Sequence, residues 1–251
     1  MAHTKEVRQA LKRLSPKAVH MFEAIESRKL GESRALPELC RALDAGPTFI
    51  AYACLAGDGT TQQLSNTVGF LSSGKKRKAM HDFLTAIRHA GADPKIVVVF
   101  DDFEPCRAWQ WDYAQEEVTL WCEILIDEHL RDVFPGFDTE VLLCSQLESN
   151  FEPGYADVYR RICNDRAHDL LIHQNFEHMR RFPNKKRTGD ERECARRKVA
   201  QYAVQGLALE RRFPNGILLQ SETPWRVKDP LYDPLRQAPM PVVHLFPDER
   251  R

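Results

Sequence analysis

The chain has 251 residues, of which 43% are hydrophobic, and its 36 basic and 36 acidic side chains leave no net charge. A chain of this length buries a sizeable core without disulfides, and its 7 cysteines form neither a CxxC pair nor a Cys/His cluster with zinc spacing. No segment approaches the roughly 18 apolar residues of a membrane span, and the start lacks the apolar stretch of a signal peptide. The composition therefore predicts a cytoplasmic protein with reduced thiols and no membrane partner.

Residues 1–45 predict an N-terminal cap of two amphipathic helices, because apolar residues recur there at helical spacing. From residue 46 to 251, short apolar runs alternate with helical stretches. The runs typical of strands buried on both faces are 49–55, 94–100, 139–145, 217–220 and 241–246. The helical stretches include 80–89, 115–130, 156–182 and 191–211. The alternation predicts a single Rossmann-like α/β domain with a mostly parallel sheet of about five strands flanked by helices.

Polar side chains follow four of these strands at the point where each strand ends. In parallel sheets, ligands bind beyond the carboxyl ends of the strands, so this coincidence is the main indication of a functional site. The alternative explanation is that the chain commonly turns polar wherever a strand passes into a loop, whether or not a site is present. The residues are Asp58 and Thr60, Asp101 and Asp102, Ser145 and Gln146, and Gln220 and Glu222.

The first strand runs into a glycine loop, Ala56-Gly57-Asp58-Gly59. Its backbone N–H groups suit a phosphate, but the loop is neither GxGxxG nor a P-loop, and a tight turn that needs glycine explains it equally well. Cys54 at the strand end is either a small buried thiol or a nucleophile, and the second role requires a nearby base and an electropositive setting.

The segment after the second strand packs acids and indoles together, at Asp101, Asp102, Glu104 and Trp109. Carboxylates and aromatic faces suit the capture of a cationic group. A Mg²⁺ site on the same acids and a plain solvent-facing acidic loop are the alternatives. His168, His173 and His178 are five residues apart and do not share one helical face, so no metal is expected there.

The charges are distributed unevenly along the chain. Residues 101–128 carry nine acids and one base, whereas residues 180–198 carry nine bases and three acids. Basic runs are either solvated helix faces or sites for a polyanion such as tRNA, whose phosphates reward clustered Lys and Arg. The residues expected to contact tRNA are Lys75, Lys76, Arg77, Lys78, Lys185, Lys186, Arg187, Arg196, Arg197 and Lys198.

Three segments in this order carry a resemblance to a known family. A strand runs into Tyr52-Ala53-Cys54-Leu55-Ala56-Gly57-Asp58, the basic residues 192–198 precede Tyr202, and a late strand leads to Thr223-Pro224. The layout resembles the tRNA-dependent cyclodipeptide synthases, which are similar in fold to class I tyrosyl-tRNA synthetase catalytic domains. It is most similar to the divergent fungal group that makes arginine-containing cyclodipeptides.

The chain departs from the family's pattern at two positions. The family's nucleophilic serine falls on Leu55, beside Cys54, and the glutamate expected four residues after Tyr202 is Gly206, so that Glu210 is the nearest following acid. The serine of the family's mechanism is absent from this chain, and direct attack between two bound esters is the alternative to a covalent intermediate.

The resemblance implies an aminoacyltransferase that forms a 2,5-diketopiperazine from arginyl-tRNA and a second aminoacyl-tRNA, without a cofactor or metal, as a monomer or homodimer. The catalytic residues it implies are Cys54, Asp58, Thr60, Tyr202, Glu210 and Glu222. The substrate-binding residues are Gly57, Asp101, Asp102, Glu104, Trp109 and Gln220.

Two other functions stay open at this point. One is a different Rossmann-like transferase for glycosyl or methyl groups, with Asp101 and Asp102 gripping a sugar or a metal-bound nucleotide, although the glycine fingerprint of nucleotide binding is missing. The other is a non-catalytic RNA-binding protein that uses only its basic faces. RNA binding alone gives no reason for carboxylates at the strand ends.

Overall fold

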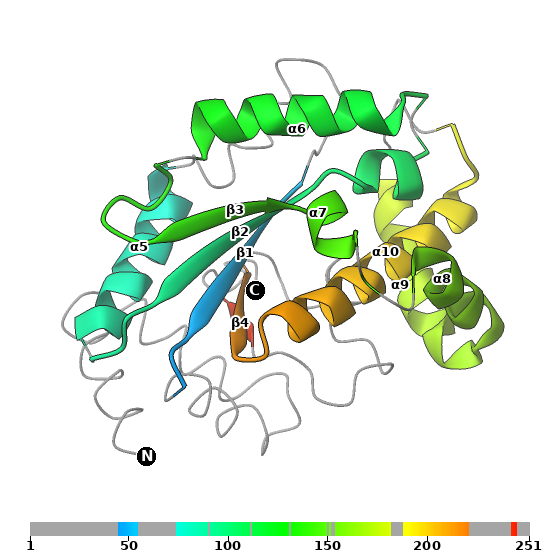
Figure 1. Ribbon diagram of the computed structural model, residues 1–251. Coiled ribbons are helices and arrows are strands. Elements are labelled where there is room, and N and C mark those ends of the chain that lie inside the picture. The colour runs from blue at the N-terminus through cyan, green and yellow to red at the C-terminus, as the bar shows by residue number, and fades with distance from the viewer. Residues whose placement is uncertain are drawn as a thin grey trace.

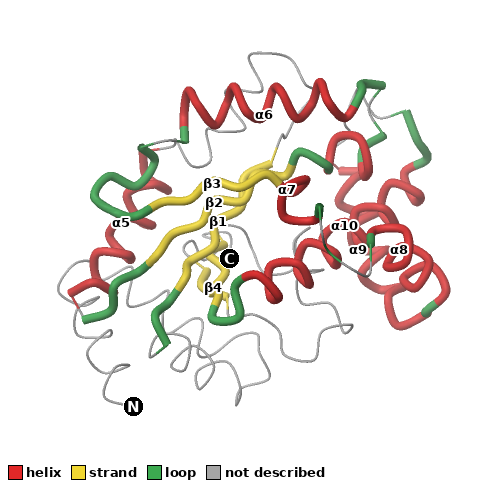
Figure 2. Tube along the Cα trace, viewed as in Figure 1, coloured by secondary structure: helices red, strands yellow, loops and turns green. Residues whose placement is uncertain are grey.

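The computed structural model describes residues 45–54, 74–89, 91–110, 112–130, 132–149, 151, 154–181, 188–220 and 242–244. The proposed N-terminal cap, the glycine loop at 56–60 and the basic loop at 185–187 lie outside these residues. What the structure describes is a sheet with helices on both faces (Figures 1 and 2).

The sheet has five parallel strands in the order β3-β2-β1-β4-β5. They span Thr48–Cys54 (β1), Lys95–Asp101 (β2), Thr139–Leu143 (β3), Gly216–Gln220 (β4) and Val242–His244 (β5). β1 lies at the centre, paired with β2 on one side and β4 on the other. The predicted fold class is confirmed, and because the central strands are covered on both faces they are almost continuously apolar.

The helices alternate with the strands as the sequence predicts, except for the unexpected short helix α7. They are α5 (Gly74–His89), α6 (Gln115–His129), α7 (Cys144–Glu148), α8 (Tyr155–Asn164), α9 (Asp169–Arg181) and α10 (Glu191–Arg212). Two short turns join them, the π-helical η1 (Glu104–Ala108) after β2 and the 3₁₀ turn η2 (Arg166–His168) before α9.

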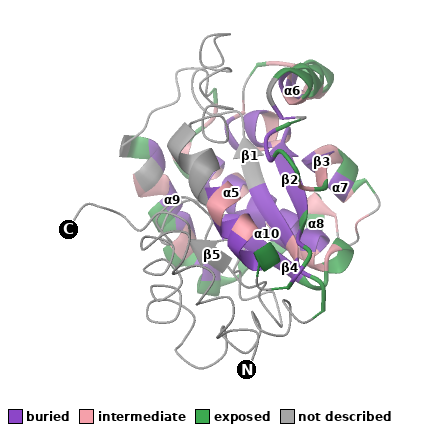
Figure 3. Ribbon diagram, turned by 90° about the vertical axis from the view of Figure 1, so that its left-hand side faces the viewer, coloured by how far each residue is buried: buried purple, intermediate pink, exposed green. Residues whose placement is uncertain are grey.

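The two faces of the sheet have separate cores (Figure 3). Phe49, Val98 and Phe100 point to the face covered by α5 and α6. Ile50 and Val99 point to the opposite face, against α7 and the end of α10. A third cluster joins α8, α9 and α10 to Trp109, so that α10 contacts both the sheet and the helical layer beside it.

Two elements differ from the sequence prediction. The strand expected to reach residue 145 ends at Leu143, and α7 follows at once, because the Asp102 carboxylate accepts a hydrogen bond from Ser145 N at 3.0 Å and so caps the new helix. The single helix expected over 156–182 is interrupted at Asp165, whose extended backbone and side-chain cap on Ala167 N start a new turn.

Phe49 provides a test of the central strand. It is fully buried and meets Phe83 of α5 edge to face at 5.4 Å between ring centroids. Phe49→Ala is expected to lower the free energy of unfolding by about 3–5 kcal/mol, because it leaves a cavity against the sheet. Leu120→Ala is the control, since Leu120 is 54% exposed. Chemical denaturation measures both, and equal losses would contradict the packing described for β1.

Candidate functional site

The candidate site lies where β2 ends beside β1. Asp101 is the last residue of β2, and its Cα is in register with that of Cys54, the last residue of β1. Asp101 and Asp102 are both 0% exposed, and Glu104 is 2% exposed. The chain therefore places three acidic side chains in a water-excluded position at the carboxyl edge of the sheet, where parallel sheets bind ligands.

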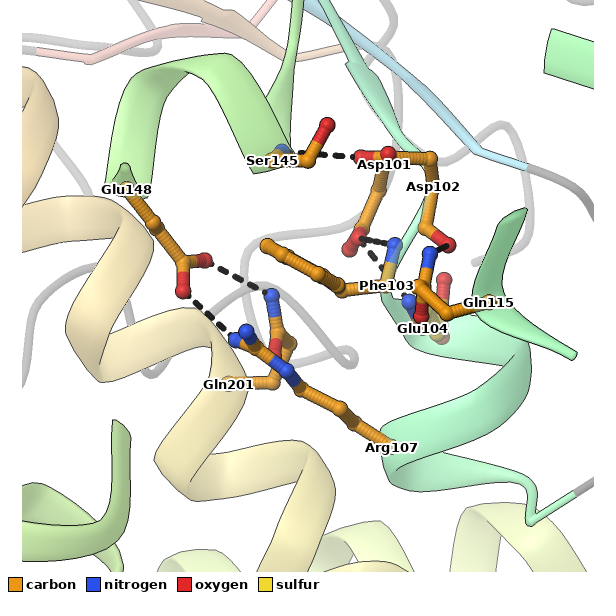
Figure 4. Close-up of polar contacts among 9 residues, drawn as sticks. All are labelled: Asp101, Asp102, Phe103, Glu104, Arg107, Gln115, Ser145, Glu148 and Gln201. Atoms are coloured by element: carbon orange, nitrogen blue, oxygen red, sulfur yellow. Dashed lines mark hydrogen bonds and ion pairs between the residues drawn. The ribbon is translucent and has the colours of Figure 1, made fainter. Parts of the chain in front are cut away.

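Asp101 uses only half of its carboxylate in the described structure. Its Oδ1 accepts hydrogen bonds from the backbone N–H groups of Phe103 at 3.1 Å and Glu104 at 3.0 Å, which turns the chain from β2 into η1 (Figure 4). Its Oδ2 is buried, and no described backbone N–H group or cationic side chain donates to it. A buried carboxylate oxygen without such a donor is rare in native proteins and requires an explanation.

The electrostatic surroundings of Asp101 favour its protonated form. Burial raises the pKa of Asp101 to about 8, and the carboxylates of Glu104, Asp102 and Glu148 add to the rise. A side-chain hydrogen bond from Gln205 acts in the opposite direction and lowers this pKa. At neutral pH this carboxyl group is therefore mostly uncharged, and an arriving cation would favour its ionised form.

Gln205 approaches the same position from α10. Its side chain is fully buried. Because Gln205 lowers the pKa of Asp101 through a side-chain hydrogen bond, the two side chains form one buried polar pair, and no third described residue bonds to Asp101 Oδ2 or to the Gln205 amide. When Asp101 is ionised, the pair presents two oxygen acceptors, which suits an ammonium or another cation with several N–H donors.

Asp102 is occupied by structural contacts. Its two carboxylate oxygens accept from Ser145 N at 3.0 Å and from Thr119 Oγ1 at 2.9 Å. Gln115 Nε2 donates to the Asp102 backbone carbonyl at 2.8 Å. Asp102 thus ties β2 to α6 and α7, and each of its carboxylate oxygens already accepts one structural hydrogen bond.

Glu104 is also engaged, in a buried ion pair with Lys198 of α10. Trp109 Nε1 donates to Glu104 Oε1 at 3.2 Å, and Lys198 Nζ lies 4.6 Å from the Trp109 ring centroid and 5.7 Å from that of Tyr202. Because Lys198 is only 4% exposed, it belongs to the interior and not to an exposed basic face. The pair holds η1 against α10.

A second network begins at Arg107 of η1. Its Nη1 atom lies 2.5 Å from Glu148 Oε2 and 3.0 Å from Gln201 Oε1, and Gln201 Nε2 donates to Glu148 Oε1 at 3.0 Å (Figure 4). The guanidinium stacks 3.3 Å above the Phe103 ring centroid. Burial raises the pKa of Glu148, and the Arg107 charge opposes that rise. η1, α7 and α10 are therefore locked together beside Asp101.

The structure brings together only part of the residue set expected from sequence. Asp101, Asp102, Glu104 and Trp109 lie close together, with Tyr202 beside Lys198. Cys54 and Gln220 end neighbouring strands. Glu210 lies two turns beyond Tyr202 on α10. The residues outside the described part are Gly57, Asp58, Thr60, Glu222, Lys185, Lys186 and Arg187.

The expected tRNA-binding residues fall on different elements. Lys75, Lys76, Arg77 and Lys78 are in the first turns of α5, and α10 carries the others that the structure describes. Arg196 and Arg197 remain partly exposed, and both pair with Glu193.

Sequence reasoning missed Arg107, Glu148, Gln201 and Gln205 as site residues. A signal existed for those on α10, because Lys198, Gln201 and Gln205 recur at intervals of three and four residues and so share one helical face. Polar residues at that spacing on a helix that is otherwise buried indicate a polar partner. For Glu148 the short helix α7 was not expected, and nothing in the sequence placed it against Arg107.

Two further findings concern the described residues as a whole. Among them, no three His, Cys, Asp or Glu side chains converge in a way that would hold a metal ion. In the same part of the chain, no helix is both long enough and apolar enough to cross a membrane.

Comparison with known proteins identifies the fold. No protein-family model and no curated protein matches the sequence. The PvcA protein from Pseudomonas aeruginosa is similar in structure, with a TM-score of 0.52 and 12% identity over 90% of this chain and 82% of that one. A tyrosyl-tRNA synthetase from Archaeoglobus fulgidus, solved with L-tyrosine, has a TM-score of 0.50 and 11% identity over 89% of this chain and 63% of that one.

The chain shares a Rossmann-like α/β fold with these two structures, and its parallel strand order agrees with that fold. A solved cyclo(L-leucyl-L-phenylalanyl) synthase is also among the similar structures, with a TM-score of 0.49 and 13% identity over 84% of this chain and 93% of that one.

Asp101 is expected to make stability depend on pH. Because its pKa is raised in the folded protein, its contribution is fully present below the unfolded-state pKa and is lost as pH rises toward about 8. Across that window the loss is about 1.4 kcal/mol per pH unit. In Asp101→Asn this slope should disappear, as measured by denaturant unfolding at pH 5, 6 and 7. Asp93→Asn is the control, because the Asp93 side chain is 96% exposed. Parallel slopes for wild type and Asp101→Asn would contradict a raised pKa.

The buried Glu104–Lys198 pair is expected to behave as a unit. Lys198→Met or Glu104→Leu alone leaves one buried charge without its partner, at a cost of about 3–5 kcal/mol in unfolding free energy. The double variant should lose much less than the sum of the two. A double-mutant cycle measured by chemical denaturation tests this, and additive losses would show that the two groups do not interact.

Proposed function

We propose that this protein is a tRNA-dependent aminoacyl transferase that joins two aminoacyl groups into a cyclic dipeptide, one of them taken from arginyl-tRNA. The observation that carries the proposal is the pair Asp101 and Gln205. The two side chains interact with each other and are buried at the carboxyl edge of a parallel sheet, beside the end of β1, where no third described residue bonds to Asp101 Oδ2 or to the Gln205 amide. A cationic group of an aminoacyl ester is the ligand that satisfies them.

Contacts with other residues already engage two of the three acidic side chains that could hold this cation. Asp102 and Glu104 are engaged with Ser145, Thr119 and Lys198. Asp101 is the carboxylate of the acidic segment that has a buried oxygen, Oδ2, to which no described backbone N–H group or cationic side chain donates. It binds either the α-ammonium that every aminoacyl ester carries or the guanidinium of arginine, and both are cations with several N–H donors.

The chemistry requires no external energy source, because the ester bond to tRNA is already activated. In each transfer the amine nitrogen forms a bond to the ester carbonyl carbon, the carbon–oxygen bond to the ribose breaks, and the amine proton ends on the ribose oxygen. If a covalent intermediate forms, the Cys54 thiolate or the Thr60 hydroxyl first attacks the ester carbonyl and releases the ribose oxygen of the first tRNA, and the amine of the second aminoacyl group then displaces the enzyme's sulfur or oxygen. Tyr202, Glu210, Glu222 and Asp58 are the candidates that orient or deprotonate the amine.

The basic segments supply the proposed docking surface for tRNA. They are the start of α5, the loop at 185–187 and the exposed arginines of α10, Arg196 and Arg197. Lys198 is assigned instead to holding η1, because it is buried against Glu104. Activity should fall steeply as salt increases, since phosphate contacts release counterions.

The reaction is tested by incubating the protein with tRNA, a synthetase mixture and amino acids, followed by mass spectrometry for diketopiperazines. An arginine-containing cyclic dipeptide is the expected product. Asp101→Asn should reduce its rate by about 100-fold or more, because the substrate cation loses its counter-charge, whereas Asp93→Asn should not change it. The absence of product while arginyl-tRNA forms and a known synthase consumes it would refute the proposal.

Two comparisons in the same assay identify the substrate group that Asp101 binds and test whether Cys54 is the nucleophile. If Asp101→Asn slows all aminoacyl donors alike, Asp101 binds the α-ammonium; if it slows only arginyl transfer, it binds the guanidinium. Cys54→Ala with an unchanged rate would exclude the cysteine as nucleophile and leave the reaction class intact.

A further inference from the structure

Six acidic residues on and beside α6 take no part in the candidate site. The segment 101–128 carries nine acids, of which Asp101, Asp102 and Glu104 are the buried carboxylates at the carboxyl edge of the sheet. The other six are all exposed: Asp112, Glu116, Glu117, Glu123, Asp127 and Glu128. α6 itself has neither lysine nor arginine. Its outer side therefore repels the phosphates of tRNA and attracts a basic group.

The same side of α6 exposes two large apolar side chains. Leu120 is 54% exposed and Ile124 is 47% exposed, and they lie one turn apart on the helix. Val118, Cys122 and Leu125 belong instead to the core beneath the helix. α6 runs along the outside of the molecule, so this short apolar stripe between acids faces away from the sheet (Figures 1 and 3).

The size and charge of this surface limit what can bind it. Two half-exposed aliphatic side chains offer far less surface than the ~800 Å² that each partner buries in a standard protein–protein interface. A second copy of the chain that met α6 with its own α6 would also bring like charges together. A short basic segment with an apolar stripe of its own fits both the size and the charge.

Residues 5–14 of the chain have this complementary chemistry. Their apolar residues recur at helical spacing, at Val7, Leu11 and Leu14. Four bases and one acid lie between and beside them: Lys5, Glu6, Arg8, Lys12 and Arg13. The basic runs at 75–78 and 185–187 contain no apolar residue, so they match the acids of α6 but not its stripe. Residues 5–14 match both.

The chain is long enough to bring the two segments together. Residues 5–14 lie outside the described structure, which begins at residue 45, so the 30 residues 15–44 join them to it. An extended chain of that length spans up to about 100 Å. α6, with 15 residues, is only about 22 Å long. Reach therefore sets no limit on a contact within one copy of the protein.

We propose that residues 5–14 bind to the outer side of α6 in the same chain, with their apolar residues on Leu120 and Ile124 and their bases beside the surrounding acids. The predicted N-terminal cap then covers the helix that holds Asp102, because Thr119 of α6 donates to the Asp102 carboxylate at 2.9 Å. The contact lies outside the core, so its loss releases the segment without unfolding the sheet. It does not depend on the reaction proposed for the protein.

Amide hydrogen exchange of the full-length protein tests the contact. Residues 5–14 should exchange about tenfold or more slowly than in a free peptide of the same sequence. Ile124→Lys should remove about tenfold of protection, because it replaces an apolar contact with a positive charge. Leu170→Lys is the matched control, since Leu170 on α9 is 67% exposed, and it should leave the exchange unchanged. Absence of protection in the wild-type protein, or equal effects of the two variants, would overturn the proposal.

The charges are tested by exchanging them. Glu123→Lys and Lys12→Glu should each reduce the protection of residues 5–14 by about threefold, as expected for exposed ion pairs. The double variant should recover part of this loss, because each position then carries the charge opposite to its own and the attraction returns. Additive losses in the double variant would show that charge does not hold the segment on α6.

Photo-crosslinking identifies the copy that supplies the segment. p-Benzoylphenylalanine replaces Glu123 in the full-length protein, which is mixed with an isotope-labelled preparation of the same variant, irradiated and analysed by mass spectrometry. The expected crosslink joins position 123 to residues 5–14 of the same isotopic species. Crosslinks between labelled and unlabelled chains would assign the surface to a second copy, and the absence of any crosslink to residues 5–14 would show that the segment does not lie on α6. Either result would overturn the proposal.

Discussion

The structure depends on one constraint, which is that three carboxylates are placed at the end of a strand where water is excluded. Asp101, Asp102 and Glu104 are all less than 3% exposed. An unpaired charge in such a position is too costly to persist, so each group must be bonded, paired or protonated. Each of the three meets this requirement differently. Asp102 accepts from α6 and α7, Glu104 pairs with Lys198, and Asp101 is held mostly protonated by its raised pKa.

These three solutions account for most of the architecture around the site. The bond from Ser145 N to Asp102 begins α7 and so brings Glu148 toward η1. The Lys198 ion pair sets η1 against α10, and the same helix then presents Gln201 and Gln205 to the sheet edge. η1 itself is a π-helical turn, a geometry that is often found at functional sites. Asp101 remains the group whose hydrogen bonding is incomplete. The nearby donors of Thr119, Ser145 and Lys198 are bonded to Asp102 and Glu104 instead.

The sheet was predictable from the sequence, but the different bonding of Asp101, Asp102 and Glu104 was not. Strands such as 95–101 are apolar and rich in valine, so their burial and parallel pairing follow from composition alone. The acidic segment at 101–104 was also recognisable as a site. Its partners come from distant parts of the chain, as with Glu104 and Lys198, and no local pattern specifies such contacts. Lys198 shows the consequence: its basic neighbours suggest a surface for tRNA, whereas its own side chain is buried.

The surroundings of the two buried networks differ in how far their charges are satisfied. Asp101 and Gln205 form a buried polar pair, and a cation that arrived there would favour the ionised form of the carboxyl group. Arg107 and Glu148 form an ion pair that Gln201 closes from α10, so both charges already have partners. A cation is therefore better matched to Asp101, because opening the Arg107–Glu148 pair would leave a charge unpaired in a largely buried position.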